Sequence, residues 1–228
     1  MKTKWGALVV DGRGKLGGHV ASKNRAGSYF RTKVTPVNPA SIYQVNVRNR
    51  FGGLSSAWRG LDPGDRVAWN AAVAAFAKTD VFGDLRNPSG FNLHQLLNNN
   101  LINIGIAQIA TPPLPEAVDA FTSLLIEAST GGETLTITFE PEIVGTHRIL
   151  LLATPGLSAG ISFVKSEYRQ LTYLNAANTS PHSAGVAYIA KFGAIPAKDT
   201  KIFVRLVQIN LTTGQAGIPI QAFCIVAA

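Results

Sequence analysis

The sequence predicts an α+β protein in two parts: an N-terminal strand/hairpin plus three-helix module, followed by an antiparallel β-sandwich. The chain has 228 residues, 46% of them hydrophobic, which is enough for one large or two small buried cores. Glycine-rich turns and helical apolar spacing fill the first half, whereas apolar residues alternate with period two in the second. We therefore expect domains at residues 1–110 and 116–228, joined by a Pro-rich linker at 111–115.

The first 38 residues have the pattern of short strands joined by glycine turns. An apolar run at 7–10 precedes a glycine-rich stretch, and residues 19–23 and 28–34 flank a predicted hairpin turn at 24–27. Three residues of the second hairpin arm alternate with apolar or uncharged ones and give one face an aromatic and basic character: Tyr29, Arg31 and Lys33.

Helical spacing then recurs three times. Asn38 as N-cap and Pro39 at the first helical position are expected to begin the first helix. Its apolar positions fall on one face: Val47, Phe51, Leu54, Trp58 and Leu61. A second helix is predicted from Asp62 and Pro63 to near Asp80, and a third from a Ser89 cap to Gly105. The bulk of the small core would come from the side chains of Trp58, Trp69 and Phe76.

The second half is rich in strand patterns and shows no helical period between them. Strands are predicted at residues 135–139, 148–153, 186–192, 202–209 and 220–226, with turns at 130–133 and 212–215. Six or seven short strands in this length are typical of an immunoglobulin or fibronectin type III sandwich. The single cysteine, Cys224, excludes an internal disulfide and is expected to be buried and inert.

Positive charge is concentrated at one end of the chain. The formal net charge is +8, and ten of the 21 Lys and Arg residues lie in the first fifty positions, where Asp11 is the only acid. Such a basic segment favours contact with a polyanion or with a neighbouring subunit. Because only 15% of residues are charged, we also expect part of the surface to be hidden in a homo-oligomer.

Two short motifs raise the possibility of an enzyme. Residues 12–17 match G-x-G-x-x-G, but the chain turns again within ten positions and no acid follows before Asp62, which favours a glycine-rich hairpin over a dinucleotide site. Residues 156–160 match G-x-S-x-G around Ser158, yet β-branched and aromatic residues follow where a helix is needed. We therefore expect a protein that is not an enzyme and needs no cofactor.

The remaining ionisable residues do not form a recognisable centre. The four histidines, His19, His94, His147 and His182, have no metal-ligand spacing, and no carboxylate pair is suited to acid–base catalysis. No apolar stretch approaches the roughly 20 residues needed to cross a bilayer, and the N-terminal apolar run is too short for a signal peptide. These patterns predict that the protein binds neither a metal nor a membrane. They also predict that it is synthesised and kept in a cytoplasm.

Several stretches between residues 14 and 105 resemble the opening of uncharacterised bacteriophage proteins. They include Gly-Lys-Leu-Gly-Gly at 14–18, Lys-Asn-Arg-Ala-Gly-Ser-Tyr-Phe-Arg at 23–31 and Ser-Gly-Phe-Asn-Leu at 89–93. The resemblance is confined to the N-terminal half and names no catalytic residue. It implies a capsid-associated virion structural protein, assembled in the host cytoplasm, whose partners are further copies and other coat proteins.

The candidate partner-binding segment is residues 13–33. The residues predicted to make the contact are Arg13, Lys15, Lys23, Arg25, Tyr29, Arg31 and Lys33. Docking to other subunits is the favoured interpretation. The alternative is a basic nucleic-acid-binding protein in which residues 1–50 follow a phosphate backbone and the aromatic side chains stack on bases.

Overall fold

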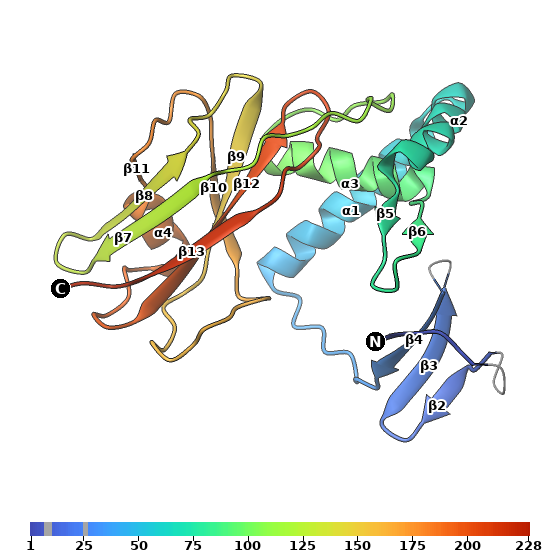
Figure 1. Ribbon diagram of the computed structural model, residues 1–228, viewed down its shortest axis with the longest axis horizontal. Helices are drawn as coiled ribbons and strands as arrows, with labels where there is room; N and C mark the ends of the chain where they lie inside the picture. The colour runs from blue at the N-terminus through green and yellow to red at the C-terminus, as the bar shows by residue number, and fades with distance from the viewer. Residues whose placement is uncertain (7–10, 25–26) are drawn as a thin grey trace.

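The computed structural model describes residues 1–6, 11–24 and 27–228, and it confirms the α+β class. Along the chain it contains a small N-terminal sheet, a helical module and a C-terminal body of two antiparallel sheets (Figure 1). The predicted domain boundaries at 110 and 116 remain predictions.

The N-terminal sheet (residues 2–32) has four short antiparallel strands in the order β1-β4-β3-β2. They are β1 (Lys2–Thr3), β2 (Gly14–Leu16), β3 (His19–Asn24) and β4 (Gly27–Thr32). The predicted hairpin is confirmed as β3 and β4, and Gly27 has a φ of 110°, which a residue with a side chain rarely adopts. The apolar run at 7–10 and two of the turn residues, 25 and 26, lie outside the described residues.

Helix α1 (Ile42–Gly60) begins three residues later than predicted. Ser41 is the N-cap, because its Oγ accepts a hydrogen bond from the N–H of Gln44 at 3.4 Å. The predicted cap, Asn38, instead accepts a hydrogen bond from the Arg48 guanidinium at 2.8 Å. Residues 33–41 form an extended connection between the sheet and this helix (Figure 1).

The predicted second helix is too long. Helix α2 (Pro63–Ala72) gives way to a 3-10 turn, η1 (Val73–Phe76), and then to a hairpin of β5 (Lys78–Thr79) and β6 (Leu85–Arg86). The Asp80 carboxylate accepts hydrogen bonds from the N–H groups of Phe82 and Asp84 at 2.8 and 3.2 Å, and so holds the chain in a turn.

Helix α3 (Gly90–Asn103) matches the prediction, with Ser89 as cap and Gly105 at a φ of 73° just past the end. Its leucines Leu93 and Leu97 pack with buried Trp69, while Trp58 and Phe76 are partly buried against them. The predicted aromatic core is therefore confirmed, although of Trp58, Trp69 and Phe76 only the Trp69 ring is fully buried.

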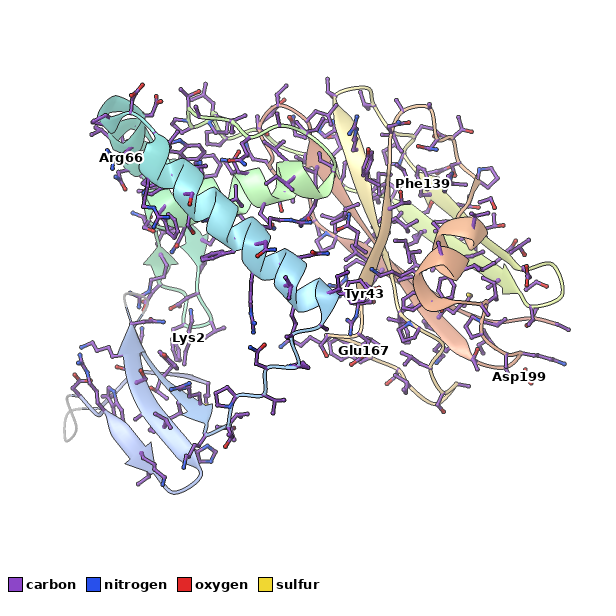
Figure 2. The ribbon with its side chains drawn as sticks, turned by 180° about the vertical axis from the view of Figure 1, so that it is seen from behind. Lys2, Tyr43, Arg66, Phe139, Glu167 and Asp199 are labelled. Atoms are coloured by element: carbon purple, nitrogen blue, oxygen red, sulfur yellow. The ribbon has the colours of Figure 1, made fainter. Side chains whose placement is uncertain are left out.

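Helix α1 is buried at one end only. Leu54 is buried and Phe51 touches the ring of Phe91 in α3, but Val47 and Phe51 are 65% and 56% exposed. Figure 2 shows the N-terminal turns of α1, up to Tyr43, running past α3 towards the C-terminal body. Part of the predicted apolar face of α1, at Val47 and Phe51, is therefore exposed to solvent.

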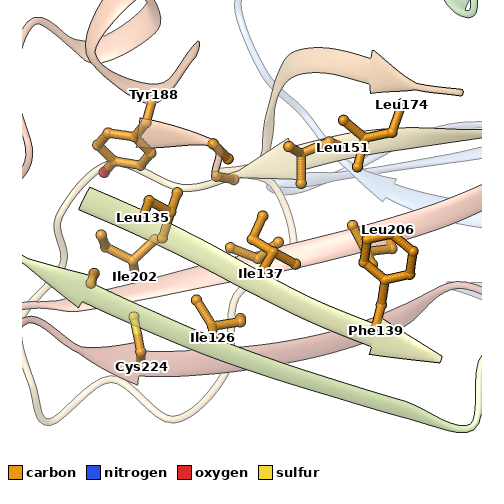
Figure 3. Packing of buried hydrophobic residues seen from close by; sticks show 14 of the residues in the cluster. Ile126, Leu135, Ile137, Phe139, Leu151, Leu174, Tyr188, Ile202, Leu206 and Cys224 are labelled. Atoms are coloured by element: carbon orange, nitrogen blue, oxygen red, sulfur yellow. The ribbon is translucent and has the colours of Figure 1, made fainter. Parts of the chain in front are cut away.

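The C-terminal body consists of two antiparallel sheets, ordered β10-β9-β12-β13 and β11-β8-β7. Their strands are β7 (Ser123–Ser129), β8 (Thr134–Glu140), β9 (His147–Ala153), β10 (Arg169–Leu174), β11 (His182–Ser183), β12 (Lys201–Asn210) and β13 (Ile220–Ile225). Alternate residues of both sheets meet in one core that includes Ile137, Phe139, Leu151 and Leu206 (Figure 3). The sequence did not predict β7 or β10.

The predicted strand at 186–192 is wrong, since these residues form helix α4 (Gly185–Phe192). Tyr188, Ile189 and Phe192 recur at helical spacing and pack into or against the body core. The Tyr188 hydroxyl donates a hydrogen bond to the carbonyl of Thr154 at 2.9 Å, and Val186 on the opposite side is 83% exposed. In so short a segment, burial of one helical face overrides β propensity.

Replacing Tyr188 with Phe tests the anchoring of α4. The substitution leaves the buried Thr154 carbonyl without its hydroxyl donor, so we expect the free energy of unfolding to fall by about 1–3 kcal/mol. Urea denaturation followed by circular dichroism measures the change. Val186→Ala in the same helix is the matched control and should change stability by less than about 0.5 kcal/mol; equal effects of both variants would contradict the assignment.

Candidate functional site

The register of the N-terminal sheet sorts the predicted contact residues onto two faces. Lys15, Val20 and Arg31 are cross-strand neighbours on β2, β3 and β4, and Tyr29 lies two positions before Arg31. Cross-strand neighbours point to the same side of a sheet, as do residues i and i+2. Lys33 continues this alternation, since its N–H donates to the Gly18 carbonyl at 2.8 Å. We call Lys15, Val20, Tyr29, Arg31 and Lys33 the basic face.

The opposite face of the sheet is covered around Phe30. Phe30 lies on it and meets the Trp5 ring edge-on, with centroids 5.6 Å apart. Lys23 pairs with Ser28 on this side and therefore does not join the basic face. Arg13 lies outside the strands, 3.7 Å from the Asp11 carboxylate, and Arg25 lies outside the described residues.

The edge strand β1, whose Lys2 is the cross-strand neighbour of Tyr29, and the residues after it contact the β5–β6 hairpin through ion pairs. Lys2 Nζ lies 3.7 Å from Asp80 Oδ2, and Lys4 Nζ lies 2.9 Å from Asp84 Oδ2. Arg86 of β6 pairs with both carboxylates, at 3.4 and 3.3 Å. Lys2, Lys4, Asp80 and Arg86 line a cavity of about 310 Å³, and its cations already have carboxylate partners from the chain itself. The seam holds the sheet in place rather than offering an anion site.

Asp80 is the central acid of this seam, with a side chain only 3% exposed. The hydrogen bond from the Phe82 N–H lowers its pKa, the desolvation of the carboxylate opposes this, and the Asp84 N–H, Arg86 and Lys2 lower the pKa further. The net effect is an Asp80 pKa below the usual value, so the Asp80 carboxylate is charged in the folded protein at neutral pH.

The cations of the basic face are in a different situation. Lys15, Arg31 and Lys33 are exposed, and within the described part of the chain no carboxylate lies within 4 Å of them. Three uncompensated charges on one small sheet produce a positive potential directed at solvent. Sequence reasoning found these residues, but it could not separate them from Lys23, whose side chain the pleat turns away.

Neither of the two catalytic-looking motifs is followed by a helix. Gly14 belongs to β2, Gly17 has a φ of 55°, and strand β3 follows, so no helix N-terminus is available to a pyrophosphate. Ser158 lies in an irregular stretch between β9 and β10 with no helix after it. Both structural expectations for these motifs are confirmed.

The buried titratable side chains His94 and Cys224 are packed among apolar and aromatic residues. His94 lies between the rings of Trp58 and Trp69, at 5.4 and 5.2 Å, and burial lowers its pKa. Cys224 is buried as predicted, and burial raises the pKa of its thiol to about 11. Among the described residues, no three His, Cys, Asp or Glu side chains gather where they could hold a metal ion.

A larger hollow of about 710 Å³ lies between α3, the β5–β6 hairpin and the β12–β13 loop. Its described lining is mainly leucine and asparagine with Lys78 and Arg86, and includes no carboxylate or histidine. It therefore contains no acid–base pair of the kind that hydrolysis or proton transfer needs.

Comparison with known proteins gives no further assignment. No family model, curated protein or solved structure matches the chain. None of the helices among residues 1–6, 11–24 and 27–228 is long and apolar enough to cross a membrane.

Acid titration tests the seam between the sheet and the hairpin. The Asp80 pKa is lowered in the folded protein, so the charged carboxylate stabilises the folded state. This stabilisation is complete above the unfolded-state pKa of about 3.9 and is lost as pH falls through the folded-state pKa. We expect the indole N–H resonance of Trp5 to shift in that acid range, and this step to be missing in Asp80→Asn. The control is Asp65→Asn in α2, which should titrate like the wild type; identical curves for all three proteins would contradict the role of Asp80.

Proposed function

We propose that this chain is a non-enzymatic structural protein of a bacteriophage virion, a capsid-associated or decoration subunit that self-assembles and docks to coat proteins through its N-terminal sheet. The observation that carries the proposal is the basic face, with three cations that no described carboxylate neutralises. An interface that supplies carboxylates would compensate these charges. Residues 33–41 form the extended connection that, with the seam at Asp80, sets the N-terminal sheet apart from the C-terminal body.

The exposed apolar part of α1 supports assembly. Its side chains and two from the preceding segment lie close together in sequence and are strongly exposed: Val34, Val37, Ile42, Val47 and Phe51. Single exposed apolar residues are ordinary, but Val47 and Phe51 lie one turn apart on the same face of α1, and such a grouped surface is typical of one that another protein covers. A subunit with one apolar and one basic contact surface can use both in a multi-copy particle.

The strand order supports an immunoglobulin/fibronectin III-like assignment for the C-terminal body. With strands lettered in chain order, β7, β8 and β11 correspond to A, B and E, and β9, β10, β12 and β13 to C, C′, F and G. The sheets E-B-A and C′-C-F-G then agree with this class of sandwich, with α4 in the E–F connection. Use of such a domain as a virion add-on is an analogy at the level of the fold.

A nucleic-acid-binding architectural or packaging protein is the second candidate. Tyr29 lies two residues from Arg31 on the basic face, so a base could stack on its ring while the cations contact phosphates. In that case the affinity for nucleic acid would fall steeply with salt. The logarithm of the binding constant would fall against the logarithm of the salt concentration with a slope of about −0.7 to −0.9 per phosphate contacted.

The first test is the mass of the nuclease-treated protein by light scattering at low and high salt. We expect the wild type to form an oligomer, and the triple variant Lys15→Glu, Arg31→Glu, Lys33→Glu to dissociate at least about tenfold more readily, because like charges then meet across the interface. The exposed residues Lys78, Lys165 and Lys198 provide a control variant with the same change in net charge. A wild type that is monomeric at both salts and binds DNA would contradict the proposal and support the second candidate.

A further inference from the structure

The three-stranded sheet of the C-terminal body has an uncovered outer face. Strand register places Leu125 opposite Thr138, Glu127 opposite Thr136, and Ser123 opposite Glu140. Ile126, Ile137 and Phe139, which alternate with these residues, fill the body core. In Figure 1 this sheet forms the near side of the body, with no helix in front of it.

This outer face is acidic and hydroxyl-rich. Its strand positions are Ser123, Leu125, Glu127, Ser129, Thr134, Thr136, Thr138, Glu140 and Ser183, and they include no Lys or Arg. Glu127 and Glu140 are exposed, and no described cation lies within 4 Å of either carboxylate. Glu133 in the β7–β8 turn adds a third exposed carboxylate beside it. We call this surface the acidic face.

We propose that the acidic face of one copy is the docking surface for the basic face of a second copy. This rests on the proposed function and names the partner of its basic face. The basic face presents three free cations and the acidic face with its turn presents three free carboxylates. Their pairing would leave no like charges opposed, and opposite potentials also favour fast association.

The two faces are compatible in architecture as well as in charge. Each belongs to a short antiparallel sheet, and two such sheets can pack face to face about 10 Å apart. Lys15 and Arg31 are separated by two strand spacings, about 10 Å, and Glu127 and Glu140 by one spacing and four residues, about 14 Å. Val20 on one face and Leu125, 58% exposed, on the other provide apolar contact between the charges.

The contact must join different copies. Ion pairs to Asp80 and Asp84 fix the N-terminal sheet to the β5–β6 hairpin, and Figure 1 shows this sheet and strands β7 and β8 at opposite ends of the molecule. An interface between unlike faces is head-to-tail, so it either closes into a ring or extends as a chain. It would use the basic face for contact between copies, so contact with coat proteins would fall to the apolar surface of α1.

Charge exchange tests the proposal. The acid-reversed variant carries Glu127→Lys and Glu140→Lys, and the base-reversed variant carries Lys15→Glu, Arg31→Glu and Lys33→Glu. Alone, each variant opposes like charges at every interface, so we expect its dissociation constant for self-association to rise at least about tenfold. In a 1:1 mixture the two variants can alternate along the assembly, so that each interface again joins a basic surface to an acidic one. We expect the mixture to recover the wild-type mass in light scattering.

Controls separate this inference from the proposed function. Glu167→Lys with Asp119→Lys makes the same charge change away from the acidic face and should leave assembly unchanged. If the wild type assembles and the acid-reversed variant assembles equally well, the acidic face is not the partner, although the proposed function stands. If the wild type does not assemble, the proposed function fails first. If the base-reversed variant loses DNA binding while the mixture stays monomeric, the partner is nucleic acid.

Discussion

The packing of α3 is the constraint on which the arrangement of the molecule depends. Leu93 and Leu97 near its start belong to the core around Trp69, whereas Leu101 and Ile104 near its end pack with Ile209 of the C-terminal body. The helix therefore belongs to two cores, and burial of both its ends fixes the helical module against the body. Displacing it would expose apolar surface on both sides at once.

Polar contacts make this joint specific. The buried Asn98 side chain accepts a hydrogen bond from the Ile109 N–H at 2.7 Å and donates one to its carbonyl at 3.2 Å. Beyond it, the Gln215 side chain donates to the Leu114 carbonyl at 2.8 Å and accepts from the Glu116 N–H at 2.9 Å. The Pro-rich segment is thus held to α3 and to the body by hydrogen bonds between side chains and its own backbone, and the helices cannot swing freely about it.

Sequence patterns predicted the elements whose signal is local. Ser89 and Gly105 mark both ends of α3, and β-branched alternation marks β8, β9, β12 and β13. The wrong predictions have tertiary causes. Residues 186–192 have strand propensity, and their helical face is stabilised only by the burial of Tyr188 in the body core. The β5–β6 hairpin depends on Asp80 accepting hydrogen bonds from two backbone N–H groups. No pattern in residues 186–192 could reveal the Thr154 carbonyl that Tyr188 reaches.

The same limit applies to the candidate site. The concentration of Lys and Arg near the N-terminus indicated a basic contact segment, but only strand register separates Lys15 and Arg31 from Lys23, and only folding shows that Lys2 and Lys4 are neutralised by Asp80 and Asp84. The chain's excess of positive charge is therefore not spread over its first fifty residues. Lys2 and Lys4 are paired in an internal seam, whereas Lys15, Arg31 and Lys33 are directed outward on one pleated face.

Separating the two charged faces has a physical consequence for assembly. Had Glu127 and Glu140 been within reach of Lys15 and Arg31 in one chain, the charges would have paired internally, where they compete with any contact between copies. The seam at Asp80 holds the basic face away from the body, so the compensation of each face requires another molecule. Since each individual ion pair at a surface is worth at most about 1 kcal/mol, a single contact would be weak, and a particle that repeats it many times gains stability from the number of copies.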